Sequence, residues 1–243
     1  MNIKLVGSGP KLFILHGGPG FSHHYLLRGL SFLKEKNELI FYDQLGCGSN
    51  VVGETPVTLE TTAREFIDLC RLLTKEAHPM DLIAHSWGTL VLMEALKQAP
   101  ELFNLIGITL FLNPVPVDIK TYETARLNFI NRLTQNTLKT YERLIVDPQN
   151  APAIMTLLLP FYSSKPTGLS GIDFHLNLNT YLSNNANLVD FDYLDQIRQF
   201  NNKAFFYSAK RTLFVLNISP LSVMPNLFIP CHLSGTSHFM RML

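Results

Sequence analysis

Short apolar runs alternate with amphipathic segments over the first half of the chain. Four of these runs end at turn-forming residues, as buried strands do, and they span residues 11–15, 38–42, 80–84 and 105–111. Apolar side chains at helical spacing fill the intervals at residues 24–36, 60–75 and 89–98. Strands that alternate with helices in this way predict a parallel sheet with helices on both faces.

The alternation stops after Pro114. From about residue 117 to 199 the pattern is helical and is punctuated by prolines and glycines, which indicates a helical insert on the sheet. A strand pattern returns at residues 203–207 and again near 227–230, where Pro230 favours an edge position.

These patterns predict the domain organisation of an α/β protein. We expect one core made of residues 1–113 and 196–243, because the strand patterns fall in these two parts. Residues 114–195 are then a helical cap inserted between them. The length of 243 residues, with 47% hydrophobic and 16% charged, suits one domain with an insert.

Charge and targeting signals narrow the possible partners. The 20 Lys and Arg nearly cancel the 19 Asp and Glu, and no basic block is present, so we expect no nucleic acid partner. Cys47, Cys70 and Cys231 cannot form a disulfide framework, which favours a reducing compartment. We expect a cytoplasmic protein with no membrane span, because the N-terminus lacks a secretory signal and polar residues interrupt the apolar stretch at 213–233.

A serine stands where the third predicted strand gives way to a helix. The segment Ala84-His85-Ser86-Trp87-Gly88 matches the nucleophile elbow G-x-S-x-G, with Ala84 at the first small position. The sharp turn of such an elbow requires small neighbours, and alanine is small enough. The alternative is an ordinary turn in which Ser86 only caps the helix.

A glycine-rich loop after the first predicted strand supplies a second part of a hydrolytic site. An oxyanion hole needs backbone N–H groups from two segments, and Gly18 of the loop 16–20 and Trp87 after the serine have these places. The alternative is a plain turn. Because the loop lacks the spacing of nucleotide-binding motifs, we expect no cofactor, and we expect no metal.

Three stretches carry a resemblance to a known family. His-Gly-Gly-Pro-Gly-Phe-Ser-His-His-Tyr-Leu at 16–26, Asp-Gln-Leu-Gly-Cys-Gly-Ser at 43–49 and His-Ser-Trp-Gly-Thr at 85–89 resemble the proline iminopeptidase (prolyl aminopeptidase) branch of the α/β-hydrolase superfamily. The resemblance implies an α/β-hydrolase fold with a cap, a Ser86 nucleophile, and the Gly18 and Trp87 N–H groups as oxyanion hole. The resemblance also implies a substrate that is a small molecule or a short peptide. We leave the oligomeric state open.

The resemblance weakens towards the end of the chain. The turn Gly-Thr-Ser-His at 235–238 is similar to the one that carries the family's catalytic histidine, which implies His238 as the base. Where the family has its catalytic aspartate this chain has Thr212, and no acidic residue follows Asp195. Asp118, shortly after a predicted strand, is a weaker candidate for the acid, the alternative being an ordinary solvated aspartate of the cap.

Three interpretations follow. The chain is a serine hydrolase that cleaves a small amide or ester, or it is an impaired relative that keeps the fold without the triad acid. Alternatively, residues from about Lys210 onward are a shifted or truncated form of an ancestral family sequence. The missing triad acid predicts that hydrolysis of a prolyl amide is weak or undetectable and that any residual turnover is esterase-like, because an activated ester leaves without a well-oriented general acid.

Overall fold

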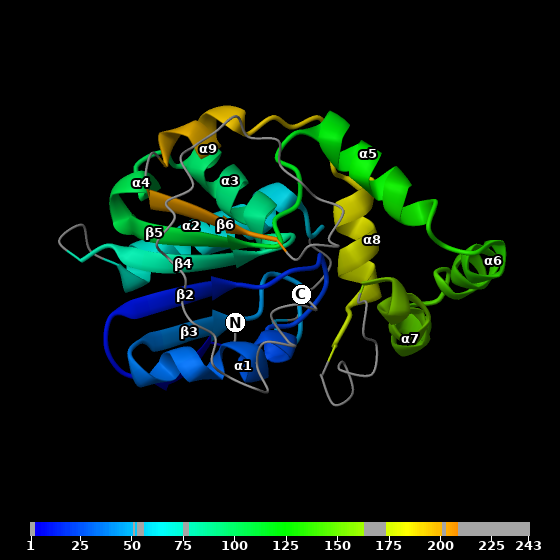
Figure 1. Cartoon of the computed structure of the whole chain (residues 1–243), viewed down its shortest axis with the longest axis horizontal. Coiled ribbons are helices and arrows are strands. Elements are labelled where there is room, and N and C mark those ends of the chain that lie inside the picture. The colour runs from blue at the N-terminus through cyan, green and yellow to red at the C-terminus, as the bar shows by residue number, and fades with distance from the viewer. Residues whose placement is uncertain are drawn as a thin grey trace.

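A six-stranded sheet forms the centre of the molecule in the computed structural model, which describes residues 3–50, 52, 56–74, 78–162, 174–200 and 203–208. The strand order is β1-β3-β2-β4-β5-β6, and all neighbours except β1 and β3 are parallel (Figure 1). The strands are β1 (Ile3–Gly7), β2 (Lys11–Leu15), β3 (Glu38–Tyr42), β4 (Met80–His85), β5 (Ile106–Leu112) and β6 (Ala204–Tyr207).

The predicted α/β architecture is confirmed. Strands β2 and β4 are parallel neighbours in which Ile14 pairs with Ile83, and β6 returns to the sheet beside β5. The strand expected near residues 227–230 lies outside the described residues.

The antiparallel strand β1 was missing from the sequence prediction. Its side chains are mostly exposed, with Leu5 at 57%, so it has no apolar run to reveal it. Backbone pairing with β3 places it at the edge, with Leu5 opposite Ile40. The segment predicted as one helix over residues 24–36 is also divided, into α1 (His24–Leu30) and the 3₁₀ helix η1 (Ser31–Glu35).

Helices cover both faces of the sheet. On one face α2 (Leu59–Leu73) packs beside α3 (Gly88–Gln98), and α9 (Leu194–Gln199) lies against α3 (Figure 1). The short helix α4 (Leu102–Leu105) leads into β5, and α1 covers the opposite face. Thr58 begins α2 with a capping box, in which its hydroxyl accepts the Thr61 N–H and the Thr61 hydroxyl accepts the Thr58 N–H.

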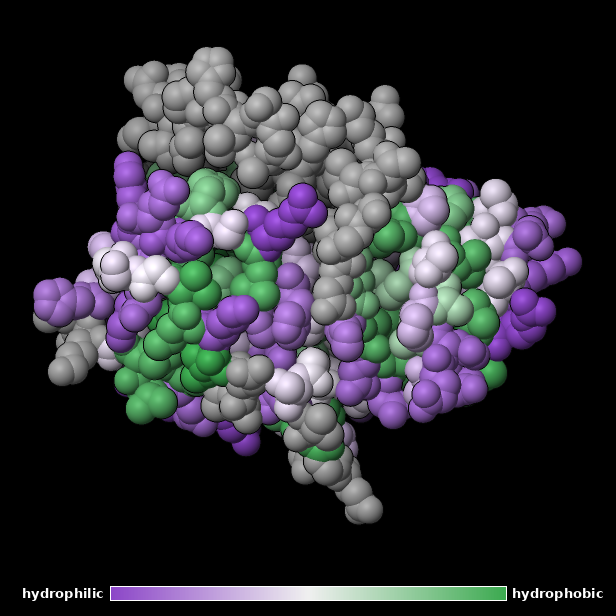
Figure 2. Space-filling view, turned by 90° about the horizontal axis from the view of Figure 1, so that it is seen from below, coloured by the Kyte–Doolittle hydropathy of each residue, from purple (hydrophilic) through white to green (hydrophobic). Residues whose placement is uncertain are grey.

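Four helices between β5 and α9 extend beyond the carboxyl ends of the strands (Figure 1). They are α5 (Ile119–Ile130), α6 (Gln135–Leu144), α7 (Ala151–Tyr162) and α8 (Leu178–Ala186), with the 3₁₀ helix η2 (Pro148–Asn150) before α7. Helix α8 is nearest to the sheet, and α6 lies furthest out. Figure 2 shows apolar patches among polar residues at this end as well as beside the sheet.

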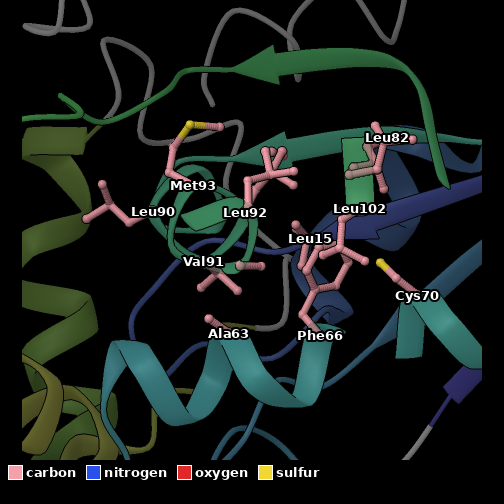
Figure 3. Packing of buried hydrophobic residues seen from close by; sticks show 14 of the residues in the cluster. Leu15, Ala63, Phe66, Cys70, Leu82, Leu90, Val91, Leu92, Met93 and Leu102 are labelled. Atoms are coloured by element: carbon pink, nitrogen blue, oxygen red, sulfur yellow. The ribbon is translucent and has the colours of Figure 1, made fainter. Parts of the chain in front are cut away.

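Alternate residues of each strand enter different cores, as the pleat of a strand requires. Phe13 and Leu15 join the cluster under α2 and α3, whereas Ile14 joins the cluster under α1. Figure 3 shows the first cluster, where Ala63 of α2 faces Val91 of α3 and Phe66 of α2 points towards Leu15 of β2. The buried residues of β2 are those in its carboxyl-terminal half, next to the loop that begins at His16.

No helix in the described part of the chain is both long and apolar enough to span a membrane.

Candidate active site

The site lies where the order of strands reverses. Strand β2 lies between β3 and β4. The chain leaves β2 towards β3 on one side and leaves β4 towards β5 on the other, so the two connections diverge at the carboxyl ends of these strands. A crevice opens at such a point in parallel sheets, and ligands bind there. The loop that begins at His16 follows β2, and the turn at Ser86 follows β4.

Ser86 occupies a strained turn between β4 and α3. Its φ angle is +49°, in the left-handed region that costs a non-glycine residue about 1–3 kcal/mol. The Ser86 N–H donates to the Leu112 carbonyl at 3.1 Å, which continues the sheet to this residue. Helix α3 begins without a side-chain cap, so the Ser86 hydroxyl does not serve as one.

Two glycines let the loop and the elbow approach closely. A Cβ on Gly17 would lie 3.1 Å from the Ser86 Cβ and 2.8 Å from the His85 Nδ1. A Cβ on Gly88 would lie 2.7 Å from the Leu15 carbonyl oxygen. A side chain on Gly17 would push the loop away from His85 and Ser86, and one on Gly88 would push α3 away from β2, so both glycines are needed for this packing.

The residue after Ser86 and the residue after Gly17 each have a backbone N–H without an acceptor among the described residues. Within the described residues, neither the Gly18 N–H nor the Trp87 N–H donates a hydrogen bond, although the neighbouring Gly17 N–H does. The Trp87 side chain is buried at 2% exposure in the core and holds its own backbone in place. Backbone N–H groups without another acceptor are what an oxyanion hole requires, so both groups stay candidates for that role.

His16 connects the first loop to the segment after β3. Its Nε2 accepts the Gln44 N–H at 3.0 Å, its Nδ1–H donates to the Gly17 carbonyl at 2.7 Å, and its own carbonyl accepts the Gln44 side-chain amide. Burial lowers the pKa of His16 to about 4, against a weaker opposing effect of the Gly17 carbonyl. His16 is therefore a neutral structural residue at pH 7.

Asp43 braces the same region. Its Oδ1 accepts from the backbone N–H and from Nδ1 of His23, and its Oδ2 accepts from the backbone N–H and hydroxyl of Ser49. Burial alone would raise the pKa of Asp43, but these hydrogen bonds outweigh burial and hold that pKa well below its ordinary value.

The same carboxylate belongs to a group that could hold a metal. His23, His24 and Asp43 each offer a ligand atom, and these atoms lie within 4.8 Å of one another. Because the Asp43 oxygens already accept four hydrogen bonds, we assign the group a role in bracing the loop.

The cysteines near the site are poor nucleophiles. Cys47 and Cys70 are free thiols, and both are buried. Burial raises the pKa of the Cys47 thiol to about 12, so it is protonated at pH 7.

Tyr25 is a site residue that the sequence analysis did not single out. Its hydroxyl accepts the Gly17 N–H at 2.6 Å and lies 2.6 Å from the His85 Nδ1. Helical spacing identifies Tyr25 only as a core residue of α1, and no sequence signal distinguishes its hydroxyl from that of any other buried tyrosine.

Of the remaining predicted site residues, the structure describes Asp118 alone. His238 and Thr212 lie outside the described residues, so the base and the position of the missing acid are still predictions. Asp118 begins α5 as its N-cap, where its Oδ1 accepts the Thr121 N–H at 2.8 Å. One carboxylate oxygen of this candidate acid therefore already accepts a hydrogen bond from the first turn of α5.

A small cavity lies between the first loop and the cap. Its volume is about 40 Å³, and its lining includes Gly18 and Pro19 from the loop, Ile154 and Met155 from α7, and Leu178 and Tyr181 from α8. None of the described residues that line it is charged. A larger hollow of about 340 Å³ runs along α2, but no residue of either loop lines that one.

A profile of the alpha/beta hydrolase family matches residues 12–213. The chain therefore belongs to the alpha/beta hydrolase family, as its strand order and elbow already indicate.

Curated relatives of the chain are proline iminopeptidases. The chain is 30% identical over 124 residues to the protein of Lacticaseibacillus rhamnosus, covering 50% of this chain and 40% of the relative. It is 38% identical over 115 residues to that of Thermoplasma volcanium, covering 45% of this chain and 37% of the relative. The matched part thus spans about two fifths of the length of these relatives.

Solved structures resemble the chain in fold. A bromoperoxidase from Bacillus anthracis superposes with a TM-score of 0.60 at 15% identity, covering 84% of this chain and 75% of that one. An esterase from Exiguobacterium antarcticum gives 0.59 at 17% identity with the same coverage. At these identities the likeness establishes the fold, and function must be argued from the site.

Proposed function

We propose that this chain is a serine hydrolase that cleaves small esters through an acyl-enzyme on Ser86. The observation that carries the proposal is the strained Ser86 turn, beside which the Gly18 and Trp87 N–H groups have no acceptor among the described residues. In an ester hydrolase these groups stabilise the oxyanion while the serine attacks the carbonyl carbon.

The reaction follows the usual acyl-transfer sequence. The Ser86 oxygen attacks the ester carbonyl as His238 takes its proton, and the carbonyl oxygen gains negative charge beside the two N–H groups. Collapse expels the alcohol, which receives the proton from His238. Water then attacks the acyl-enzyme with His238 again as base, and the acid product leaves.

The cavity beside Pro19 favours an uncharged, short acyl group. The described residues that line it offer no carboxylate to hold a free amine, and 40 Å³ has room for about three water-sized groups. The relatives' name raises proline iminopeptidase as a finer activity, which requires recognition of an N-terminal amine. We therefore place ester hydrolysis ahead of prolyl amide hydrolysis.

A second candidate is a catalytically impaired member of the family. Thr212 at the place of the family's acid favours it, because a histidine without an orienting carboxylate loses about four orders of magnitude in turnover. The variant Thr212→Asp separates the two candidates. A large rise in ester turnover supports impairment of the parent, whereas no rise supports a parent that works without this acid.

Steady-state kinetics on two substrates test the proposal. The parent is expected to hydrolyse p-nitrophenyl acetate, and to hydrolyse proline p-nitroanilide at least about tenfold less efficiently. Ser86→Ala should lower ester turnover by about 10³-fold or more.

Ser31→Ala is the matched control and should retain turnover. Ser31 lies at the end of α1, where its hydroxyl donates to the Arg28 carbonyl. Efficient cleavage of the prolyl amide contradicts the substrate assignment, and ester turnover that survives in Ser86→Ala contradicts the mechanism.

A further inference from the structure

The hydroxyl of Tyr25 joins the two loops of the site from a third element, helix α1. It contacts the Gly17 N–H in the loop after β2 and the His85 Nδ1 in the residue before Ser86. Tyr25 is 2% exposed and His85 is 7% exposed, so water does not compete for these contacts. A single buried hydroxyl thus links the oxyanion loop to the nucleophile turn.

The direction of the two hydrogen bonds follows from the groups involved. A backbone N–H can only donate, so the Tyr25 oxygen accepts from Gly17. Among the described residues the His85 Nδ1 is the acceptor within reach of the hydroxyl proton, and on that basis we assign the ring proton of a neutral His85 to Nε2. Burial raises the pKa of Tyr25, so the hydroxyl keeps this proton at neutral pH.

The bond to Gly17 determines which amide of the loop is available. Because the Gly17 N–H is committed to Tyr25, the next N–H in the chain, that of Gly18, is the one left to face a substrate oxygen. Gly17 has no side chain to hold its peptide in place and lies against Ser86. Without the hydroxyl this flexible pair of glycines would sample other orientations.

We infer that Tyr25 is a positioning residue, whose hydroxyl holds the Gly18 N–H in the oxyanion hole by tying Gly17 to His85. The inference rests on the proposed function, since it assigns Tyr25 a part in the same site. Tyr25 does not touch the reacting atoms; its effect passes through the backbone of the loop. Its loss should therefore weaken transition-state binding more than substrate binding.

The aromatic ring of Tyr25 has its own support. It stacks on Phe174 with ring centroids 5.5 Å apart and meets Phe21 edge-on at 5.8 Å. The substitution Tyr25→Phe keeps this packing and removes only the hydroxyl. It therefore separates the positioning role from the role of the ring in the core.

Tyr42 provides a matched control. It is fully buried in β3, and within the described residues its hydroxyl has no hydrogen-bond partner. Tyr42→Phe likewise removes one buried tyrosine hydroxyl, but from the other apolar cluster and without removing a hydrogen bond to either loop. With p-nitrophenyl acetate, Tyr25→Phe should lower kcat by about 10-fold to 100-fold and change KM less than about twofold. Tyr42→Phe should leave both constants unchanged, and equal kcat in the parent and Tyr25→Phe overturns the inference.

Amide hydrogen exchange tests the hydrogen bond between the Gly17 N–H and the Tyr25 hydroxyl without an activity assay. Tyr25→Phe should speed exchange of the Gly17 N–H by about tenfold or more while the amides of β2 and β4 keep their protection. Unchanged exchange at Gly17 overturns the inference. If the parent fails to hydrolyse the ester, the proposed function fails, and faster exchange at Gly17 still supports the positioning role.

A measurement on the parent protein tests the hydrogen-bond network even if the Tyr25→Phe variant does not fold. Nitrogen-15 NMR of the His85 ring should show an unprotonated Nδ1 and a proton on Nε2. A protonated Nδ1 at neutral pH would mean that the Tyr25 hydroxyl does not donate to His85, and it overturns the proposed direction of the network.

Discussion

Helices α3 and α7 are both rich in apolar residues but bury them very differently. Every residue of α3 from Gly88 to Leu96 is buried, between the sheet on one side and α2 and α9 on the other. Helix α7 buries only Ala151, Ile154 and Met155. Its partners in the third apolar cluster are α6 and α8, not the sheet. The core packs closely around the turn at Ser86, whereas α7 offers apolar side chains to a cavity.

Helix α8 is intermediate between these two regions. Its Thr180 hydroxyl donates to the Gly46 carbonyl at 2.6 Å, and its Ser183 hydroxyl donates to the Val57 carbonyl at 2.9 Å. Just before it, the Asn177 N–H donates to the Gly20 carbonyl at 2.7 Å. Polar contacts to the core therefore anchor this part of the cap beside the oxyanion loop.

The largest expected effect is on the free energy of unfolding, when a leucine is replaced by alanine in α3 and, for comparison, in α5. Leu92→Ala in α3, at a fully buried position, should destabilise the protein by about 2–5 kcal/mol, because it leaves a cavity in a packed core. Leu127→Ala in α5, where the leucine is 59% exposed, should cost less than about 0.5 kcal/mol. Urea unfolding of both variants measures the difference. Equal losses would mean that the outer cap is part of the same tightly packed core.

A smaller effect concerns acid stability. The pKa of His16 falls from 6.5 to about 4 on folding, so between these values the unfolded chain binds more protons, and stability must fall as pH falls. From pH 7.5 to 4.5 this loss amounts to about 2–3 kcal/mol. The depressed pKa of Asp43 adds a loss in the same direction at still lower pH, through and below the ordinary range of a carboxyl group.

His16→Gln isolates this contribution. Urea unfolding across pH 7.5 to 4.5 should give a flatter stability profile for the variant, even if the variant is less stable at every pH. His78→Gln, at an exposed position, is the control and should keep the slope of the parent. A slope that His16→Gln leaves unchanged would show that His16 is not the group that titrates.

The smallest effect tests the anchoring of α8. Thr180→Val removes the hydroxyl on the Gly46 carbonyl and should cost about 1–2 kcal/mol, since a buried acceptor loses its partner. Thr124→Val in α5 removes a hydroxyl bonded to the Lys120 carbonyl of its own helix at an exposed site, and should cost little. Denaturant unfolding compares them. A Thr180→Val variant as stable as Thr124→Val would indicate that apolar contacts, and not this bond, hold α8.

Much of the core could be predicted from the sequence because burial on both sheet faces leaves continuous apolar runs. Strands β2, β3 and β4 begin where the pattern predicts, and the turn at Ser86 follows from small residues after such a run. Strand β1 escaped prediction because backbone pairing alone places it in the sheet. The Tyr25 network escaped as well, since a buried tyrosine reveals its ring by periodicity but not the partners of its hydroxyl.

Fluorophosphonate labelling followed by mass spectrometry tests the central claim, that Ser86 is a reactive nucleophile in an oxyanion hole. The probe reacts with activated serines and leaves a stable adduct on the serine oxygen. The account predicts one adduct per chain on the peptide that contains Ser86, no adduct in Ser86→Ala, and parent-like labelling in Ser31→Ala. Labelling that persists unchanged in Ser86→Ala, or a parent that does not react, would contradict it.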